Sequence, residues 1–323
     1  MKKEILRILQ LRGDVSVADL TDELGISRQM VHKILRALLE EGVIQKLGKS
    51  PRTYYRISAK QEIVEAFPLS NEKSIFLNDH FLFISELGKR VDGVDGFMLW
   101  CEKQKLPFEK TVDEFIRTKK KYLSYVGSNG LISGLDKIKT TKGFDEIGLD
   151  ELFYQDFYAI ERFGKTKLGN LLHFAKQGQN KIMMKEISIL INPSVNALLK
   201  QFSIDAIGFI PPTIKREIQI MHVLEKNLNY PVPTINIKKV KGDIVIPQKA
   251  LSKLEDRIAN AKSSIVVPET KRYRRILLID DAVGSGATMN ETAIKLKRKA
   301  VTEEIIGYAV TGSFKGFDVI QEV

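Results

Sequence analysis

The sequence contains one cysteine, Cys101, among 323 residues. A single cysteine cannot form an intramolecular disulfide or a cysteine-rich zinc site, so the sequence excludes both as supports of the fold. This cysteine usage is typical of a reducing compartment such as the cytoplasm. We expect Cys101 to be a buried, unreactive thiol.

Long apolar runs are also missing. No stretch approaches the roughly 18–20 consecutive apolar residues of a membrane-spanning helix. In the first segment, MKKEILRILQLRGD, charged residues interrupt the apolar ones within every helical turn, which is typical of an amphipathic helix and not of a signal peptide. We therefore expect a soluble, cytoplasmic protein without a membrane partner.

An excess of acidic residues is absent as well. The chain has 51 Lys and Arg residues against 40 Asp and Glu residues, a formal net charge of +11. This balance favours anionic partners such as nucleic acid, phosphorylated metabolites or anionic lipid, without choosing among them. The hydrophobic content of 43% is enough for a sizeable core, and the length predicts two or three domains.

The start of the chain is predicted to contain three short helices and a hairpin. Apolar residues at helical spacing predict the first helix over residues 3–13. The second begins at the capping residue Ser16 and ends at Gly25, and Ser27 caps the third. Residues 43–57 then have the pattern of two short strands joined by a loop.

This order of elements resembles the winged helix-turn-helix domains of bacterial and archaeal regulators, over about residues 1–60. In such domains the third helix enters the major groove of double-stranded DNA and the hairpin, or wing, lies along the backbone. Residues 1–60 hold 12 Lys and Arg against 7 Asp and Glu, which suits phosphate contacts. A protein-interaction module with a solvated basic face is the alternative. The predicted DNA-binding residues are Ser27, Arg28, Gln29, His32, Lys33, Arg36, Lys49 and Arg52.

Residues 61–150 are predicted to be a mainly helical linker region. They show helical periodicity interrupted by glycine-containing turns. Aromatic residues such as Trp100 and Phe115 lie in apolar helical patterns, so we expect them in a core. The basic run from Arg117 to Lys121 is predicted to be a solvated face, with an extended DNA contact as the alternative.

From about Ser203 the pattern changes to short apolar strands alternating with helices, which predicts a parallel α/β sheet. The continuous apolar run over residues 274–280 indicates a central strand that is buried on both faces. The other strands are predicted at residues 206–210, 233–240, 263–267 and 304–310, and the helices at residues 214–228, 252–264 and 289–299.

The segment ILLIDDAVGSGAT, residues 276–288, has the pattern of a ligand site at the carboxyl end of that central strand. Gly284 and Gly286 allow a tight turn whose amides can bind a phosphate at the start of the next helix. Paired acids would repel the phosphate, so they are expected to bind a ribose diol, with or without Mg²⁺. A magnesium site of a phosphatase or NTPase, or simple helix capping, is the alternative.

The core pattern DD-x-x-x-x-G-x-T resembles the phosphoribosyl pyrophosphate (PRPP) signature of type I phosphoribosyltransferases. Ser285 and Gly284 stand where the usual loop often has threonines. The resemblance implies that Asp280 and Asp281 are the catalytic acids, that they hold the ribose hydroxyls, and that they take part in binding Mg²⁺. It also implies that the 5′-phosphate of PRPP is bound by Gly284, Ser285, Gly286, Ala287 and Thr288. Ala282 and Val283 complete the PRPP-binding motif.

Within that superfamily, about residues 150–323 are most similar to the competence-associated ComF type. The resemblance implies a hood at about residues 151–202 and a phosphoribosyltransferase-type domain over residues 151–323. The RGFNQ-like stretch common in that family is missing, and no residue identifies an acceptor base. The resemblance further implies a pyrophosphate loop of Pro211, Pro212, Thr213, Lys215 and Arg216, and a lid that includes Gln248, Lys249, Ser252 and Arg257.

Three hypotheses about function remain open. In the first, the C-terminal domain binds PRPP or a related phosphoribosyl nucleotide and changes how the winged helix binds DNA. In the second, the protein is a magnesium-dependent phosphoribosyltransferase that acts on a nucleobase or related acceptor. In the third, the fold is a scaffold for a DNA-processing partner. Because winged-helix regulators usually bind two half-sites, we expect a homodimer.

Overall fold

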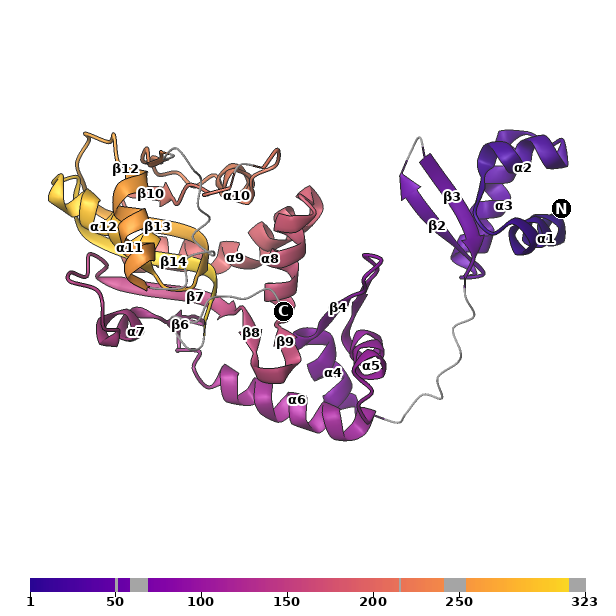
Figure 1. The fold of residues 1–323 in the computed structure, drawn as a ribbon, viewed down its shortest axis with the longest axis horizontal. Coiled ribbons are helices and arrows are strands. Elements are labelled where there is room, and N and C mark those ends of the chain that lie inside the picture. Colours follow the sequence, from indigo (N-terminus) through magenta and orange to yellow (C-terminus); the bar gives the residue numbers. More distant parts are fainter. Residues whose placement is uncertain (50–51, 59–68, 215, 241–253, 314–323) are drawn as a thin grey trace. The chain divides into compact units, whose positions relative to one another are not determined.

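The computed structural model describes residues 1–49, 52–58, 69–214, 216–240 and 254–313. The chain divides after Pro68 into two compact units, which are coloured along the sequence in Figure 1. We call Met1–Pro68 the N-terminal unit and Leu69–Val323 the C-terminal unit, and describe each by itself.

The N-terminal unit has the three helices and the hairpin that the sequence predicts. Ser16 forms a capping box with Asp19, and the Ser27 side chain accepts a hydrogen bond from the Met30 amide at 3.3 Å. Leu20, Val31 and Leu35 are buried in its core. Its elements are α1 (Lys2–Arg12), β1 (Val15–Ser16), α2 (Val17–Leu24), α3 (Arg28–Glu40), β2 (Ile44–Lys49) and β3 (Arg52–Ile57), with sheet order β1-β3-β2.

The C-terminal unit is built on a five-stranded, mostly parallel sheet. Its strand order is β10-β13-β14-β7-β6. The first four strands run parallel, and only the short edge strand β6 pairs antiparallel. This mixed α/β sheet confirms the predicted fold class at that level. The strands are β6 (Ile132–Ser133), β7 (Glu151–Phe157), β10 (Ala206–Phe209), β13 (Tyr273–Val283) and β14 (Thr302–Gly312).

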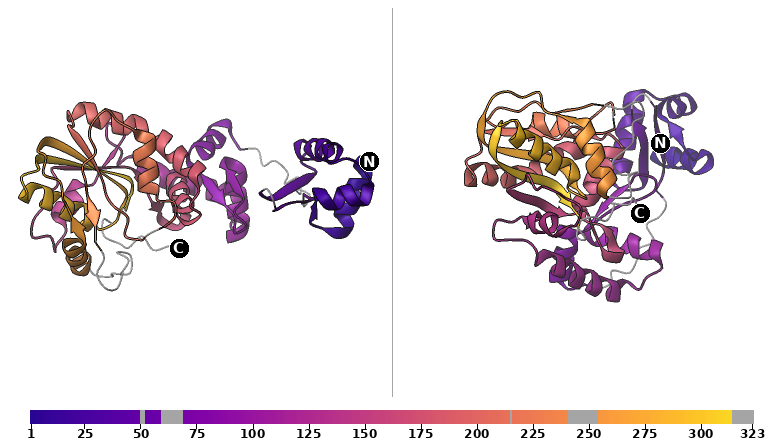
Figure 2. Two further views of the ribbon diagram at one scale, coloured as in Figure 1. Left: turned by 90° about the horizontal axis from the view of Figure 1, so that it is seen from above. Right: turned by 60° about the vertical axis from the view of Figure 1, so that its left-hand side comes forward.

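Helices cover both faces of this sheet, as the two views of Figure 2 show. On one face Leu277 and Tyr308 share a core with α8 (Lys167–Gln177), α9 (Lys181–Gln201) and α10 (Ile220–Leu228). On the other face Leu278 shares a core with α7 (Leu135–Thr140) and α12 (Ala287–Arg298), and α11 (Leu254–Ser264) packs against α12. Burial on both sides explains why β13 is continuously apolar.

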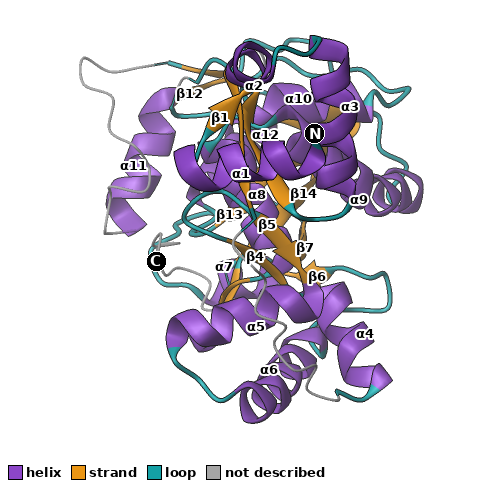
Figure 3. Cartoon of the chain, turned by 90° about the vertical axis from the view of Figure 1, so that its right-hand side faces the viewer, coloured by secondary structure: helices purple, strands orange, loops and turns teal. Residues whose placement is uncertain are grey.

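The region expected to be a linker, residues 61–150, lies from Leu69 onward inside the C-terminal unit. Leu77, Phe97 and Phe115 share one hydrophobic core with Leu278 of the central strand, so the region cannot be a separate connector. Figure 3 shows its helices α4, α5 and α6 gathered together. The elements are α4 (Asn71–His80), β4 (Leu82–Ile84), β5 (Arg90–Asp92), α5 (Gly93–Gln104) and α6 (Phe108–Leu123).

Of two side-chain predictions for this region, one is confirmed and one is wrong in part. Cys101 is 2% exposed, and burial raises the pKa of its thiol to about 11, so it is the inert cysteine that was expected. In the basic run, the Lys119 and Lys121 ammonium groups form ion pairs with Asp156 and Glu161 at 3.0 and 2.8 Å. Lys119 is buried, so the prediction of a solvated face is wrong for that residue, whereas Lys121 is exposed as expected.

Three sequence predictions differ from the structure. Residues 233–240 form no full strand of the main sheet: Thr234 makes an isolated parallel bridge to Ile207 of β10, and β11 (Lys238–Lys239) pairs with β12 (Ile265–Val266). Helix α10 begins at Ile220 instead of residue 214. The hood predicted for residues 151–202 includes the sheet strand β7.

The remaining small elements are β8 (Ala159–Ile160), η1 (Glu161–Phe163) and β9 (Gly164–Lys165).

Helix α9 corrects the expectation that nothing in the chain approaches a membrane span. By length and composition alone, its 21 residues are long and apolar enough to cross a membrane. Met184, Ile187 and Ile191 are fully buried against neighbouring helices of the C-terminal unit. The core helix of a globular domain has the same composition, and these contacts favour that role for α9.

Candidate functional site

The N-terminal unit presents a polar face on α3. Arg28, Gln29, His32, Lys33 and Arg36 are all exposed, while Val31, Leu35 and Leu38 of the same helix are buried. Periodicity therefore placed both faces of the helix correctly. Ser27 caps the helix, and its hydroxyl accepts the Met30 amide, so its contribution to this face is structural.

The wing, β2 and β3, adds three more exposed cations, Lys46, Lys49 and Arg52. Lys49 and Arg52 are the last pair of the hairpin ladder before its connecting loop, and both are exposed. Arg56, farther along β3, instead forms a two-pronged ion pair with Asp14. The positive charge available to a ligand on the wing is thus carried by Lys46, Lys49 and Arg52.

In the C-terminal unit a cavity of about 510 Å³ opens where β10 and β13 end. Parallel strands bring their carboxyl ends to the same edge of a sheet, which is where open α/β sheets bind ligands. The cavity is bounded by the loop between β13 and α12, by the segment after β10, and by one side of α8. Every described residue of the predicted PRPP motif and pyrophosphate loop lines it: Pro211, Pro212, Thr213, Arg216, Asp280, Asp281, Ala282, Val283, Gly284, Ser285, Gly286, Ala287 and Thr288.

The paired acids approach this cavity from two sides, because successive side chains of a strand alternate between its faces. The Asp281 carboxylate forms an ion pair with Lys176 of α8 at 2.6 Å. The Asp280 carboxylate accepts the Asp281 amide at 2.7 Å and lies close enough to Lys239 to be stabilised by its charge. Burial, together with the neighbouring Asp281 carboxylate, nevertheless raises the pKa of Asp280 to about 7.

The glycine-rich turn follows directly after the acids. Gly286 has φ of 72°, and a Cβ there would lie 2.6 Å from Ile138, so backbone conformation and packing both require glycine. Gly284 has neither constraint. Helix α12 then starts at Ala287, so its N-terminal amides and the positive end of its dipole face this turn.

The structure describes part of the predicted pyrophosphate loop and lid. The Thr213 hydroxyl accepts a hydrogen bond from Lys239 at 2.7 Å. Arg257 of α11 is 5% exposed and reaches the cavity wall, and burial lowers the pKa of its guanidinium. Lys215, Gln248, Lys249 and Ser252 lie outside the described residues.

Sequence reasoning missed the cavity residues that α8 and β11 contribute. Lys176, Gln177 and His173 project from one side of α8, and the Tyr158 hydroxyl lies 3.2 Å from Nδ1 of His173. Lys239 comes from the segment expected to form a sheet strand. The spacing of His173, Lys176 and Gln177 along a helix places them on one side, but nothing in the sequence says that this side faces the acids.

The wall of the cavity carries more positive than negative charge. Among the described residues of this wall, the cationic side chains outnumber the acidic ones by four to two. The acids are Asp280 and Asp281, and the cations are Lys176, Arg216, Lys239 and Arg257. A ligand with more than one anionic group would therefore be electrostatically favoured. Among the described residues, no three His, Cys, Asp or Glu side chains come together as an all-protein metal site.

A comparison with known families tests the N-terminal unit. Residues 1–45 match the family model of winged helix-turn-helix DNA-binding domains. The N-terminal unit is a winged helix-turn-helix DNA-binding domain. In winged helix-turn-helix domains the third helix enters the major groove, and α3, with Arg28, Lys33 and Arg36 exposed, is the third helix of this unit.

The match ends within β2, so most of the wing and the entire C-terminal unit lie outside it. No curated protein matches the chain. The cavity is therefore the feature that indicates what the C-terminal unit binds.

Proposed function

We propose that the protein is a DNA-binding regulator whose C-terminal unit binds PRPP or a related phosphoribosyl ligand and thereby changes the affinity of the winged helix for DNA. One observation carries the proposal. A single cavity at the carboxyl end of β13 brings together two carboxylates and a glycine-rich turn at a helix N-terminus. These are complementary to a sugar diol and to a phosphate, and both groups occur on a phosphorylated ribose.

The charges around the cavity support a ligand with a second anionic group. The turn from Gly284 to Thr288 can accommodate one phosphate with backbone amides and hydroxyls. The cations Lys176, Arg216, Lys239 and Arg257 lie on the remaining walls, where their positive charge would favour a second anionic group of the ligand. The pyrophosphate of PRPP supplies such a group, which favours PRPP over ribose 5-phosphate.

The residues present also fit a magnesium ion bound together with the ligand. Mg²⁺ is commonly held by one or two carboxylates plus phosphate oxygens of the substrate, without a complete protein cage. Asp280 and Asp281 are the carboxylates available for that role. When bound, the ion would neutralise charge on the pyrophosphate.

Calorimetric titration with PRPP and Mg²⁺ tests the ligand assignment. The wild type should bind, and Asp280→Asn/Asp281→Asn should lower the affinity at least about tenfold, because each carboxylate loses a charge-assisted hydrogen bond. Asp205→Asn, which changes an exposed acid at the opposite end of β10, is the matched control and should bind normally. Wild-type affinity in the double variant would refute the assignment.

A phosphoribosyltransferase is the second candidate, favoured by the α8 wall of the cavity. Tyr158 and His173 lie beside apolar Leu172 and Met221, which is a suitable surface for a planar acceptor next to the proposed ribose site. In the reaction, positive charge develops on the sugar as pyrophosphate leaves, and the nearby carboxylates would stabilise it. Release of pyrophosphate that depends on one nucleobase would establish this activity.

The location and assembly follow from the same proposal. A DNA-binding domain and a core role for α9 support the predicted cytoplasmic location. A homodimer is proposed because a winged helix commonly binds one half of a two-fold symmetric site. Its test is the molar mass in solution by light scattering, and a monomer that binds DNA at nanomolar affinity would contradict it.

A further inference from the structure

Helix α8 contacts the proposed ligand site with its last turn. Lys176 and Asp281 are 22% and 16% exposed, and their 2.6 Å ion pair lies within the cavity. A carboxylate oxygen that holds an ammonium group cannot accept a hydroxyl along the same direction. A ligand diol that takes the Asp281 oxygen bound by Lys176 would displace Lys176 from it.

The turn that follows Lys176 contacts a second wall of the same cavity. The side chain of Gln179 accepts a hydrogen bond from the Ile218 amide at 2.7 Å. The side chain of Gln177 accepts one from Arg216 at 3.5 Å. The end of α8 is thus bonded both to Asp281 and to the segment after β10. A ligand bound against either of these walls would therefore act on this helix.

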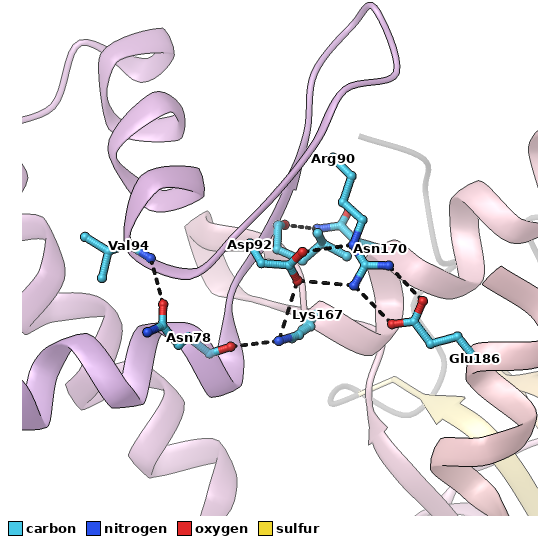
Figure 4. Close-up of polar contacts among 8 residues, drawn as sticks. Asn78, Arg90, Asp92, Val94, Lys167, Asn170 and Glu186 are labelled. Carbon is cyan, nitrogen blue, oxygen red and sulfur yellow. Dashed lines mark hydrogen bonds and ion pairs between the residues drawn. The ribbon is translucent and has the colours of Figure 1, made fainter. Parts of the chain in front are cut away.

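The opposite end of α8 is bonded to the region that follows the winged helix in the chain, as Figure 4 shows. Lys167 donates to the Asn78 carbonyl at 2.7 Å and lies 3.6 Å from the Asp92 carboxylate. Asn170 donates through its side-chain amide to the Leu82 carbonyl at 2.8 Å.

The contacted elements are themselves tied together. Asn78 accepts the Val94 amide through its side chain at 3.3 Å, and Arg90 joins Asp92 at 2.9 Å to Glu186 of α9 at 2.7 Å. This segment from α4 to β5 begins three residues after the N-terminal unit ends at Pro68. A displacement at Lys167 and Asn170 therefore acts on the part of the C-terminal unit nearest in sequence to the DNA-binding domain.

Between its two ends α8 has the packing of a rigid element. Leu168, Leu171, Leu172 and Ala175 are buried in the core beneath it. Its 11 residues span about 16 Å, and a packed helix of this length shifts as one body more readily than it bends.

We propose that α8 couples the ligand cavity to the DNA-binding domain: a ligand displaces Lys176 from Asp281, and the helix passes that displacement through Lys167 and Asn170 to residues 78–92. This inference rests on the proposed function and names the element that carries its regulation. The coupling needs two arrangements of α8, one with Lys176 on Asp281 and one with Lys176 released to an anionic group of the ligand.

Two variants at the output end of α8 test this coupling in the full chain. Lys167→Met and Asn170→Ala remove contacts to residues 78–92 and leave every cavity residue in place. We expect both to bind PRPP with Mg²⁺ as the wild type does, measured by calorimetry. PRPP should shift wild-type DNA affinity by about tenfold, and that shift should fall below about twofold in both variants. Lys181→Met, an exposed lysine at the start of α9, is the charge-matched control and should keep the full shift.

A third variant tests the input end. Lys176→Met removes the displaced group itself, so DNA affinity should no longer differ between PRPP-free and PRPP-saturated protein. Saturation is set from the dissociation constant of the variant, so weaker binding does not hide the result. A full wild-type shift in Lys176→Met, or in both Lys167→Met and Asn170→Ala, would overturn the role of α8. A wild type that fails to bind PRPP would instead overturn the proposed function.

Discussion

The two units place their functional groups in opposite ways. The winged helix carries Arg28, Lys33 and Arg36 on one exposed face of one helix, above a small core. The C-terminal unit encloses Asp280 and Asp281 in a cavity whose walls come from segments more than 100 residues apart. A surface made by one helix binds a large polyanion, whereas an assembled cavity selects a small molecule.

This difference teaches how a ligand signal could arise. An exposed helix face has one arrangement, and its affinity depends mainly on the charges that it presents. A cavity assembled from several elements can shift those elements when a ligand fills it. Regulation is therefore expected to start in the C-terminal unit and to end in the winged helix.

The largest expected effect is a loss of stability in one unit that leaves the stability of the other unchanged. Leu35 is 1% exposed in the core of the winged helix, and Leu35→Ala should destabilise that unit by about 2–5 kcal/mol. Scanning calorimetry should show one transition moving to lower temperature while the transition of the C-terminal unit stays. Leu277→Ala, in the central strand, should do the reverse. A single transition that moves with both variants would contradict independent units.

The next effect concerns DNA affinity. Arg28→Ala/Lys33→Ala should weaken binding by about 1–3 kcal/mol and reduce the salt dependence, because two phosphate or base contacts are lost. Lys110→Ala, which changes an exposed lysine of α6, is the control for net charge. PRPP binding should stay unchanged in both. A gel-shift titration without any difference would favour a protein-interaction role for α3.

Two glycines of the same turn offer a smaller, matched test within the cavity. Gly286→Ala should destabilise the C-terminal unit by about 1–2 kcal/mol, because φ is 72° and the new methyl group meets Ile138. Gly284→Ala meets open space and should be tolerated. Chemical denaturation measures both. An equal loss of unfolding free energy in the two variants would mean that the backbone conformation of the turn does not require glycine at Gly286.

The last prediction is a pH dependence of stability confined to the C-terminal unit. With a pKa raised to about 7, Asp280 binds its proton more tightly in the folded state than in the unfolded chain, where its pKa is about 4. Its contribution to the free energy of unfolding therefore falls as pH rises from about 4 to 7. The stability of Asp280→Asn relative to wild type should therefore rise between pH 5 and pH 8, by at most about 1.4 kcal/mol for each unit by which the two pKa values differ. A difference that does not change with pH would contradict the raised pKa.

The periodicity of apolar residues and the helix-capping residues were enough to predict the winged helix. Its elements are short, and elements that follow one another in the sequence also pack against one another. Ser16, Ser27 and Gly25 mark helix ends in the sequence and occupy those positions in the structure. The strands β10, β13 and β14 were recognisable for a similar reason, since runs of buried apolar residues identify central strands.

The long-range packing could not be predicted in the same way. No local pattern shows that Phe97 and Phe115 share a core with Leu278, or that β7 lies beside β14. The same limit applies to the cavity. The motif from Asp280 to Thr288 is contiguous and was found, whereas Lys176 reaches Asp281 only through the fold.

The most direct test of the central claim is a DNA-binding titration of the full chain with and without PRPP and Mg²⁺, with pyrophosphate release followed in the same samples over a panel of nucleobases. The account predicts a PRPP-dependent change in DNA affinity of about tenfold without pyrophosphate release. DNA affinity that is unaffected by PRPP, together with pyrophosphate release that depends on one base, would contradict it.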